Sequence, residues 1–202
     1  MRWDRPPTHD VRVTLPTWVV ERVDYAQPYP TAESRMRLAI ALASENVDRG
    51  TGGPFGAAIF ERESGRLIAV GVNGVTRLNN STVHAEMLAF QLAEKRIGSY
   101  SLRGGDHPDH EIFTSCAPCA MCLGAALWSG VTRVTFAALR EDAERIGFDE
   151  GPVFDASYAY LEARGVEVVR GLLRDEGCAV LDRYQAAGGE VYNADSATPG
   201  DA

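Results

Sequence analysis

The feature that most constrains this chain is a pair of short motifs that place metal-binding side chains at two predicted helix starts. His84 and Glu86 form an H-x-E motif at the start of one helix, and Cys119 and Cys122 form a P-C-x-x-C motif where a strand passes into another helix. Side chains three residues apart on a helix share a face, so the two thiolates can bind one tetrahedral ion. His84 supplies a third ligand from the other helix start.

The residue types suit a catalytic zinc ion. Pro118 fits the first helical position, and the free N–H groups of a helix start favour thiolate over thiol. Two thiolates and a neutral imidazole leave one position of the ion to water, whose pKa zinc lowers. Glu86 does not share a helix face with His84, so we expect it to move protons rather than bind metal. H-x-E followed by P-C-x-x-C is the signature of zinc-dependent deaminases.

Two other interpretations also use Cys116. The run C-x2-C-x2-C resembles part of a ferredoxin-type iron–sulfur motif, but the following Cys-Pro is missing and Cys178 is remote. A closed structural zinc site with Cys116 as fourth ligand would leave Glu86 without a role. Both interpretations are disfavoured and remain open at this point.

Composition limits the class of partner. The chain has 202 residues, a 45% hydrophobic content and a formal net charge of −8, which suits one globular domain and disfavours nucleic acid as a partner. No targeting segment and no apolar run long enough to span a membrane is evident, so no membrane partner is expected. Clustered cysteines indicate metal ligands in a reducing compartment, and the expected location is the cytoplasm.

Hydrophobic periodicity predicts an α/β domain over residues 31–187, with strands alternating with helices in its second half. Thr31 is the predicted N-cap of the first helix, and Ser64 and Gly65 mark a hairpin turn. The expected helices span residues 31–49, 83–96, 118–128, 141–146, 155–164 and 176–187, and the expected strands span 55–61, 66–72, 111–115, 131–137 and 166–170.

The two ends of the chain have a different composition. Residues 1–30 are rich in proline and are predicted to form an N-terminal extension, with a short edge strand at residues 11–15. Residues 188–202 are rich in Gly, Ser, Asp and Pro and are predicted to form a flexible C-terminal tail.

Between residues 35 and 150 the chain resembles the cytidine deaminase-like superfamily and, within it, the bacterial guanine deaminases. This resemblance implies a three-layer α/β/α fold with a mixed central sheet of about five strands. The residues that carry it are Gly52-Gly53-Pro54-Phe55-Gly56-Ala57, Asn73, the H-A-E motif at 84–86, Thr114-Ser115-Cys116, Pro118-Cys119, Met121-Cys122-Leu123-Gly124-Ala125, Trp128 and Gly147-Phe148-Asp149.

The resemblance implies that His84, Cys119 and Cys122 hold one Zn²⁺ with a catalytic water, and that Glu86 is the main proton shuttle. Glu150 falls where guanine deaminases carry a second acidic residue that assists the leaving amine. The implied reaction converts guanine to xanthine and ammonia. The resemblance also implies a homodimer, in some relatives with an exchanged C-terminal segment.

Four further residues are assigned to substrate by the same resemblance. Asn73 would hydrogen-bond the edge of the base, Phe55 would pack against the ring, and Phe148 and Asp149 belong to the loop that would close the site. The segment after Glu150 matches less well, and its tyrosines are candidates for covering the pocket: Tyr158, Tyr160, Tyr184 and Tyr192.

Substrate choice is less constrained than reaction type. Ala117 stands where glutamate is usual in the family, and Val83 where alanine is usual. Guanosine, cytosine, cytidine or an amino-triazine would fit the same core. A tRNA adenosine deaminase shares both motifs, but the acidic balance and the Thr-Ser-Cys run disfavour it.

Four residues with reactive or bulky side chains are assigned no part in the chemistry. His107 and His110 are expected in an exposed loop because Gly, Pro and Asp surround them. Trp128 is expected in the core and Cys178 is expected to be a packed thiol.

Overall fold

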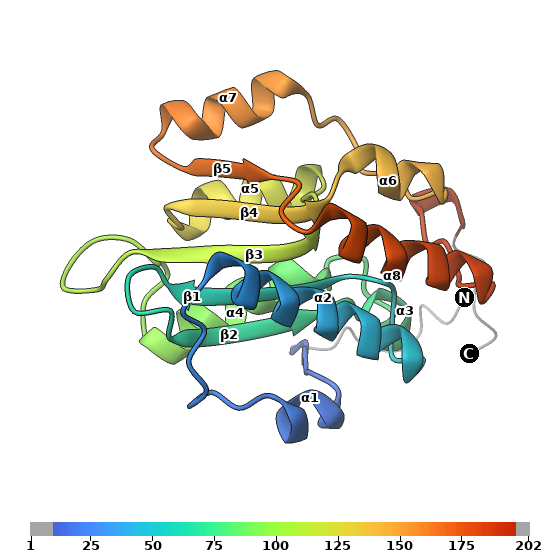
Figure 1. Cartoon of the computed structure of the whole chain (residues 1–202), viewed down its shortest axis with the longest axis horizontal. Coiled ribbons are helices and arrows are strands. Elements are labelled where there is room, and N and C mark those ends of the chain that lie inside the picture. The colour runs from blue at the N-terminus through green and yellow to red at the C-terminus, as the bar shows by residue number, and fades with distance from the viewer. Residues whose placement is uncertain (1–9, 197–202) are drawn as a thin grey trace.

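The computed structural model describes residues 10–196, and its centre is a five-stranded sheet in the order β2-β1-β3-β4-β5 (Figure 1). The strands are β1 (Gly56–Glu61), β2 (Leu67–Val72), β3 (His110–Cys116), β4 (Arg133–Ala138) and β5 (Glu167–Arg170). β1 pairs antiparallel with both β2 and β3, whereas β3, β4 and β5 run parallel. The mixed sheet of five strands predicted from the sequence is confirmed.

The inner part of the sheet is buried because helices cover both of its faces. Every residue of β2 and of β3 is buried, so these strands lack the polar alternation of a sheet with one solvated face. The β1–β2 hairpin turns where the sequence predicts it. Gly65 adopts φ 70° there, and its N–H donates to the carbonyl of Glu61 at 2.9 Å.

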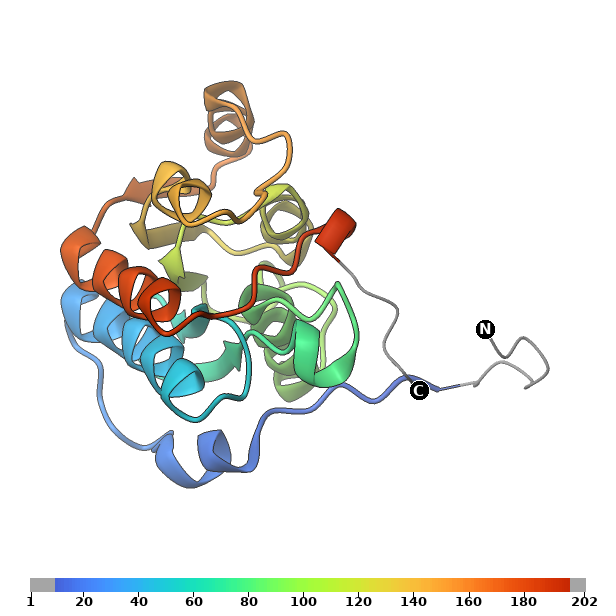
Figure 2. The same ribbon diagram turned by 90° about the vertical axis from the view of Figure 1, so that its right-hand side faces the viewer.

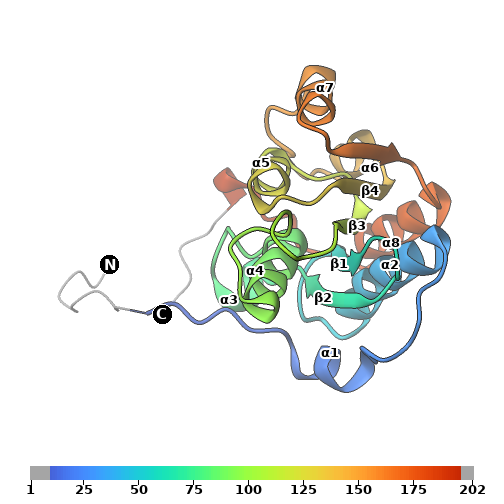
Figure 3. The same ribbon diagram turned by 90° about the vertical axis from the view of Figure 1, so that its left-hand side faces the viewer.

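The helices form the outer two layers. α2 and α8 lie on one face of the sheet, and α4 and α5 lie on the other (Figures 2 and 3). This arrangement confirms the predicted three-layer fold. The helices are α1 (Thr17–Arg22), α2 (Ala32–Asp48), α3 (Val75–Leu78), α4 (Ala85–Ile97), α5 (Ala120–Ser129), α6 (Arg140–Arg145), α7 (Asp155–Ala163) and α8 (Arg174–Ala186), followed by a short 3-10 turn at Ala194–Ser196.

A separate apolar core lies on each face of the sheet. The core under α4 and α5 includes Ile59 and Ile112, and the core under α2 includes Phe60 and Phe113, so successive residues of one strand serve opposite cores. α2 begins where predicted, because the Thr31 hydroxyl accepts a hydrogen bond from the N–H of Ser34 at 3.1 Å.

The described part of the predicted N-terminal extension is mostly exposed, but α1 and Tyr29 attach it to the domain. Within the described part of the chain, residues 11–15 form no strand, and α1 follows them. Trp18, Val19 and Tyr29 are buried in the core under α2. Residues 1–9, including His9, lie outside the described residues.

Two predictions about single side chains are wrong. His110 is not in an exposed loop: it is the first residue of β3, is 1% exposed, and its Nδ1 lies 2.8 Å from the carbonyl oxygen of Leu102. Trp128 is not in the core: it is 82% exposed on the outer side of α5. Among the helices of residues 10–196, none is both long and apolar enough to cross a membrane.

Candidate active site

The three predicted metal ligands meet at the ends of two helices. One donor atom each from His84, Cys119 and Cys122 lies within 4.8 Å of the other two. The Nδ1 atom of His84 faces both sulfur atoms, at 3.4 Å from Cys119 Sγ and 3.6 Å from Cys122 Sγ. These three residues therefore present one nitrogen and two sulfur donors to a common point.

Two of these ligands are N-cap residues rather than first-turn residues. His84 caps α4 and Cys119 caps α5, and neither side chain bonds the backbone of its own helix. The helix predicted to begin at Pro118 is α5, which begins two residues later, at Ala120. Both N-cap residues have extended backbone geometry, and their side chains face one another instead of bonding their own helices.

The protonation of the two thiols differs. Hydrogen bonds from Cys122 and from His84 lower the pKa of Cys119 to about 4. The hydrogen bond that Cys122 donates to Cys119, together with burial, raises the pKa of Cys122 well above its usual range. A cation at this point would draw off the second proton. Imidazole nitrogen and thiolate sulfur are ligands that suit Zn²⁺, so the donor set fits a zinc site with one position open.

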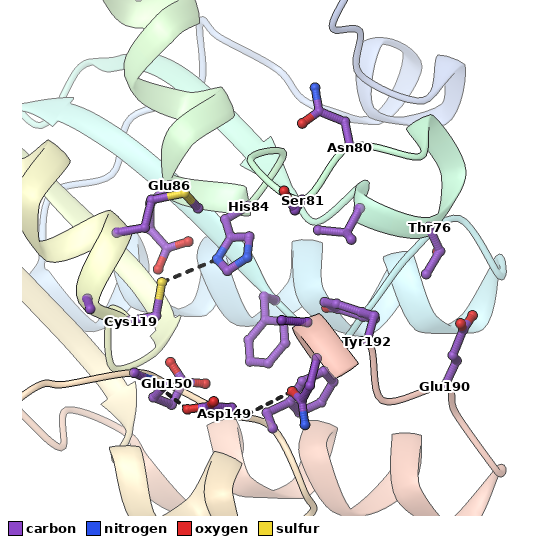
Figure 4. A pocket seen from close by; sticks show the side chains of 18 of the residues that line it. Thr76, Asn80, Ser81, His84, Glu86, Cys119, Asp149, Glu150, Glu190 and Tyr192 are labelled. Carbon is purple, nitrogen blue, oxygen red and sulfur yellow. Dashed lines mark hydrogen bonds between the residues drawn. The ribbon is translucent and has the colours of Figure 1, made fainter. Parts of the chain in front are cut away.

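Two buried carboxyl groups lie beside this cluster. Burial, reinforced by the negative charge of Cys119, raises the pKa of Glu86 to about 7 and the pKa of Glu150 to about 8. Figure 4 shows both side chains near Cys119, Glu86 from α4 and Glu150 from the loop after α6. The carbonyl of Glu150 accepts a hydrogen bond from the N–H of Ala120 at 3.0 Å, which attaches this loop to the start of α5.

These residues border a cavity of about 880 Å³. Seven of the nine residues proposed from sequence line it: Phe55, His84, Glu86, Cys119, Phe148, Asp149 and Glu150. The rings of Phe55 and Phe148 meet edge to face, with centroids 5.0 Å apart. The cavity therefore combines an aromatic wall with a metal-binding wall, as a site for a flat polar ring requires.

The other two predicted residues, Cys122 and Asn73, do not line the cavity. Asn73 is 1% exposed, and its Oδ1 accepts hydrogen bonds from the N–H groups of Gly53 at 3.4 Å and Val75 at 3.2 Å. Its Nδ2 is buried and has no hydrogen-bond partner among the described residues. An unpaired buried donor carries an energetic cost and marks a place where a ligand atom could bind.

The C-terminal segment forms part of the cavity wall, in contrast to the predicted flexible tail. Glu190, Tyr192, Asn193 and Ala194 line the cavity, and the Tyr192 ring contacts Phe148 edge to face at 5.0 Å. Asn193 holds the loop beneath it: its Nδ2 donates to the carbonyl of Gly147 and its Oδ1 accepts from the N–H of Asp149, both at 2.9 Å. Residues 197–202 lie outside the described part.

The four candidate tyrosines have different positions. Tyr192 lines the cavity, and Tyr184 stacks on Phe148 with centroids 6.2 Å apart. Tyr158 packs on Phe136 in the core, and Tyr160 is half exposed on α7. The sequence also gave no signal for α3 and the loop after it, which add the polar rim of the cavity: Thr76, Asn79, Asn80 and Ser81.

The geometry defines a class: a metal-binding cluster of one histidine and two cysteines beside two acidic groups is that of a zinc-dependent deaminase. Residues 30–138 match the family described as the cytidine and deoxycytidylate deaminase zinc-binding region. The chain belongs to this family, and it is a zinc-dependent hydrolytic deaminase.

Relatives of known structure and activity extend this assignment. The guanine deaminase of Bacillus subtilis (strain 168) is 43% identical over 60% of this chain and 74% of its own length. The solved structure of guanine deaminase from Nitrosomonas europaea is 41% identical, covers 90% of this chain and all of its own, and has a TM-score of 0.83. Another solved structure, of a variant in complex with 8-azaguanine, is 42% identical, covers 88% of this chain and 98% of its own, and has a TM-score of 0.84.

Proposed function

We propose that this chain hydrolyses guanine to xanthine and ammonia. Water adds to C2 of the ring, and the bond from C2 to the exocyclic nitrogen breaks. The observation that carries the proposal is the juxtaposition of two buried carboxyl groups, Glu86 and Glu150, with one metal-binding cluster in an aromatic-walled cavity. The identity to two guanine deaminases supports guanine as the substrate.

His84, Cys119 and Cys122 would hold the zinc ion. Bound zinc supplies a water molecule whose pKa is lowered enough for it to act as nucleophile near neutral pH. The remaining chemistry consists of proton transfer and positioning by the side chains of the cavity.

Glu86 would carry the first proton transfer. Its carboxyl group is buried at the start of α4, next to the cluster. It would accept a proton from the attacking water and deliver it to the ring nitrogen next to C2. General acid–base transfer by a positioned carboxylate contributes a factor of about 10²–10⁴ in rate.

Glu150 would assist the departure of the amine. Burial favours its neutral form, which can donate a proton to the exocyclic nitrogen as the bond to C2 breaks. Two carboxyl groups suit this reaction because a ring nitrogen and the leaving amine both need protons. Glu150 reaches the cavity from the loop after α6 and Glu86 from the first turn of α4, so the two groups can serve different atoms of the ring.

Asn73, Phe55, Phe148 and Asp149 would position the base. The unpaired Nδ2 of Asn73 could donate to an acceptor on the purine edge, while Phe55 packs against the ring. Asp149 is exposed on the closing loop. Polar side chains of α3 and the loop after it form the outer rim of the cavity, so nucleosides and other aminated rings are tested along with guanine.

The test is ammonia release by the zinc-loaded protein with guanine, guanosine, adenine, cytosine, cytidine and an amino-triazine. Turnover of guanine alone is expected. Turnover of another compound instead would retain the deaminase assignment and refute guanine. A supercoiled plasmid and a tRNA pool serve as further ligands: the net charge of −8 predicts no retention of either at moderate salt.

We further propose that two copies of the chain associate through the outer face of α5. This helix contains no charged residue, Trp128 is 82% exposed on it, and nothing lies within 4 Å of a side chain added at Gly124. Tyr100, 90% exposed, lies in the loop whose Leu102 bonds the end of α5. Sedimentation should show a dimer for the native chain, and Trp128→Glu should give a monomer; a native monomer would refute the proposal.

A cytoplasmic location is proposed on the chemistry of the cysteines. All four are free thiols in the structure, and two of them are the proposed metal ligands. Such a site requires reduced thiols, which the cytoplasm maintains. Localisation of a tagged full-length chain by fractionation tests this directly.

A further inference from the structure

Asn46 of α2 connects the two backbone segments that carry proposed substrate contacts. It is completely buried, and its Nδ2 donates to the carbonyl oxygens of Gly53 and Asn73, each at 2.9 Å. The same segments also bond one another. The Asn73 N–H donates to the carbonyl of Phe55 at 3.0 Å, and the Phe55 N–H donates to that of Gly53 at 2.8 Å. Asn46 thus ties together the backbones of Phe55 and Asn73.

The orientation of the Asn46 amide is determined by its neighbours. Its Oδ1 accepts the hydroxyl proton of Thr51 at 2.7 Å, so Nδ2 must face the two carbonyl oxygens. The opposite orientation would place Oδ1 against two acceptors. Every hydrogen-bonding atom of this side chain is therefore used, and the amide cannot turn without losing bonds in a buried place.

The hydrogen bonds continue from Thr51 to Trp18 of the N-terminal helix α1. Trp18 donates from Nε1 to the Thr51 hydroxyl at 3.0 Å. Its ring is 5% exposed, belongs to the core under α2, and has the Arg49 guanidinium 5.5 Å from its centroid. The residues Trp18, Thr51 and Asn46, with the backbones of Gly53 and Asn73, are called the Asn46 network below.

Gly52 makes the close approach within this network feasible. A Cβ atom at residue 52 would lie 2.0 Å from the carbonyl oxygen of Asn73 and 2.8 Å from Asn46 Nδ2. Any side chain there would push the loop away from Asn73. The loop therefore packs against the backbone of Asn73 more closely than any residue with a side chain would allow.

We infer that Asn46 and Trp18 are positioning residues for substrate recognition, and that this is the contribution of the N-terminal extension to the enzyme. The inference rests on the proposed function, in which Phe55 and Asn73 contact the purine. Neither Asn46 nor Trp18 lines the cavity. They act by fixing the backbone from which the recognition side chains project, so α1 is coupled to the site through hydrogen bonds.

Two variants break the network at different places. Asn46→Asp places an acceptor oxygen against two carbonyl oxygens without changing the volume. Trp18→Phe removes the Nε1 donor while an aromatic ring stays in the core beneath Arg49. His110→Ala is the control. It also removes a buried hydrogen bond, but His110 pairs with Glu61 at the end of β1 that lies away from Phe55 and the network.

The first readout is amide hydrogen exchange of the zinc-loaded protein without ligand. Asn46→Asp and Trp18→Phe should speed exchange in peptides covering residues 51–56 and 73–76, where the Gly53 and Val75 N–H groups bond Asn73. His110→Ala should leave these peptides unchanged. Unchanged exchange in both network variants would overturn the inference, whichever substrate the enzyme uses.

The second readout is the affinity for 8-azaguanine by calorimetry. Mutations along such networks change coupling by factors of about 2–30, so we expect about tenfold weaker binding for Asn46→Asp and about threefold for Trp18→Phe, with zinc content unchanged. In an Asn73→Ala background the Asn46→Asp penalty on binding should largely disappear, whereas its effect on thermal stability should persist. An equal penalty in both backgrounds would reduce Asn46 to a structural role. Failure of the unmodified protein to bind 8-azaguanine or turn over guanine would instead refute the proposed function.

Discussion

Replacing Glu86 by glutamine changes one atom and removes the group proposed to move protons in the cavity. The side chain is 8% exposed and lies at the start of α4 beside the metal-binding cluster. Glutamine has the same length and shape, so the packing around it should be preserved. The variant should therefore bind zinc as the native protein does.

The magnitude follows from what glutamine cannot do. Glutamine cannot accept a proton. Glu150 enters the cavity from the loop after α6 and Glu86 from α4 (Figure 4), so we expect Glu150 not to replace Glu86 at the ring nitrogen. Loss of one positioned acid–base group lowers kcat by about 10²–10⁴, or about 3–5 kcal/mol of transition-state stabilisation. Because a buried carboxylate is replaced by a neutral amide, the free energy of unfolding should stay constant or rise.

The assay is steady-state formation of xanthine, combined with zinc analysis and thermal unfolding of the same preparations. Glu94→Gln is the matched control, since it is the same substitution on the same helix and lies outside the cavity lining. It should retain native kcat. A kcat for Glu86→Gln within tenfold of the native value, with zinc present, would refute the role of Glu86 as proton shuttle.

Three further predictions concern the metal site, the cavity wall and acid stability. Cys119→Ala should lose zinc along with activity, and full zinc retention in metal analysis would contradict the ligand set. Gly53→Ala should raise KM, because a Cβ atom there would lie 1.9 Å from the Tyr192 hydroxyl and must displace that side chain; an unchanged KM would contradict the contact. Hydrogen bonds from Arg174 lower the pKa of Asp142 to about 2 from 3.8, so this contact stabilises the fold above about pH 4 and ceases to do so as the pH falls toward 2. Asp142→Asn should cost roughly 1–2 kcal/mol at neutral pH and should flatten the acid-unfolding profile, since Arg174 is partly exposed.

The sheet and the metal-binding cluster could be predicted because their signals are local. β1 and β2 are short apolar runs, and each of the two motifs, H-x-E at 84–86 and P-C-x-x-C at 118–122, lies within a few residues of the chain. The ends of these elements were less accurate. A proline before Cys119 suggested an earlier helix start than the structure has, because a proline is also accepted just before an N-cap.

The outer wall of the cavity could be predicted only in part, since it depends on contacts between distant segments. Tyr192 was one of four tyrosines that the sequence offered as pocket covers, and only the structure shows that it lines the cavity, where it packs on Phe148 from 44 residues further along the chain. Trp18 likewise lies in a proline-rich segment of the sequence, and only the structure shows its hydrogen bond to Thr51. Trp128 was misjudged for the same reason, because local sequence does not show whether a tryptophan faces the core or another molecule.

The positions of His84 and Cys119 as N-caps have a consequence for how this protein could evolve. Ser, Thr, Asp or Asn at these two sites would cap α4 and α5 and would stabilise the fold by about 1 kcal/mol each relative to a residue that does not cap. Selection for heat resistance without selection for activity should therefore favour these substitutions early, and each would remove a ligand. At these two helix starts the metal-free chain is therefore less stable than it would be with capping residues, and in exchange the chain has two ligands for an ion.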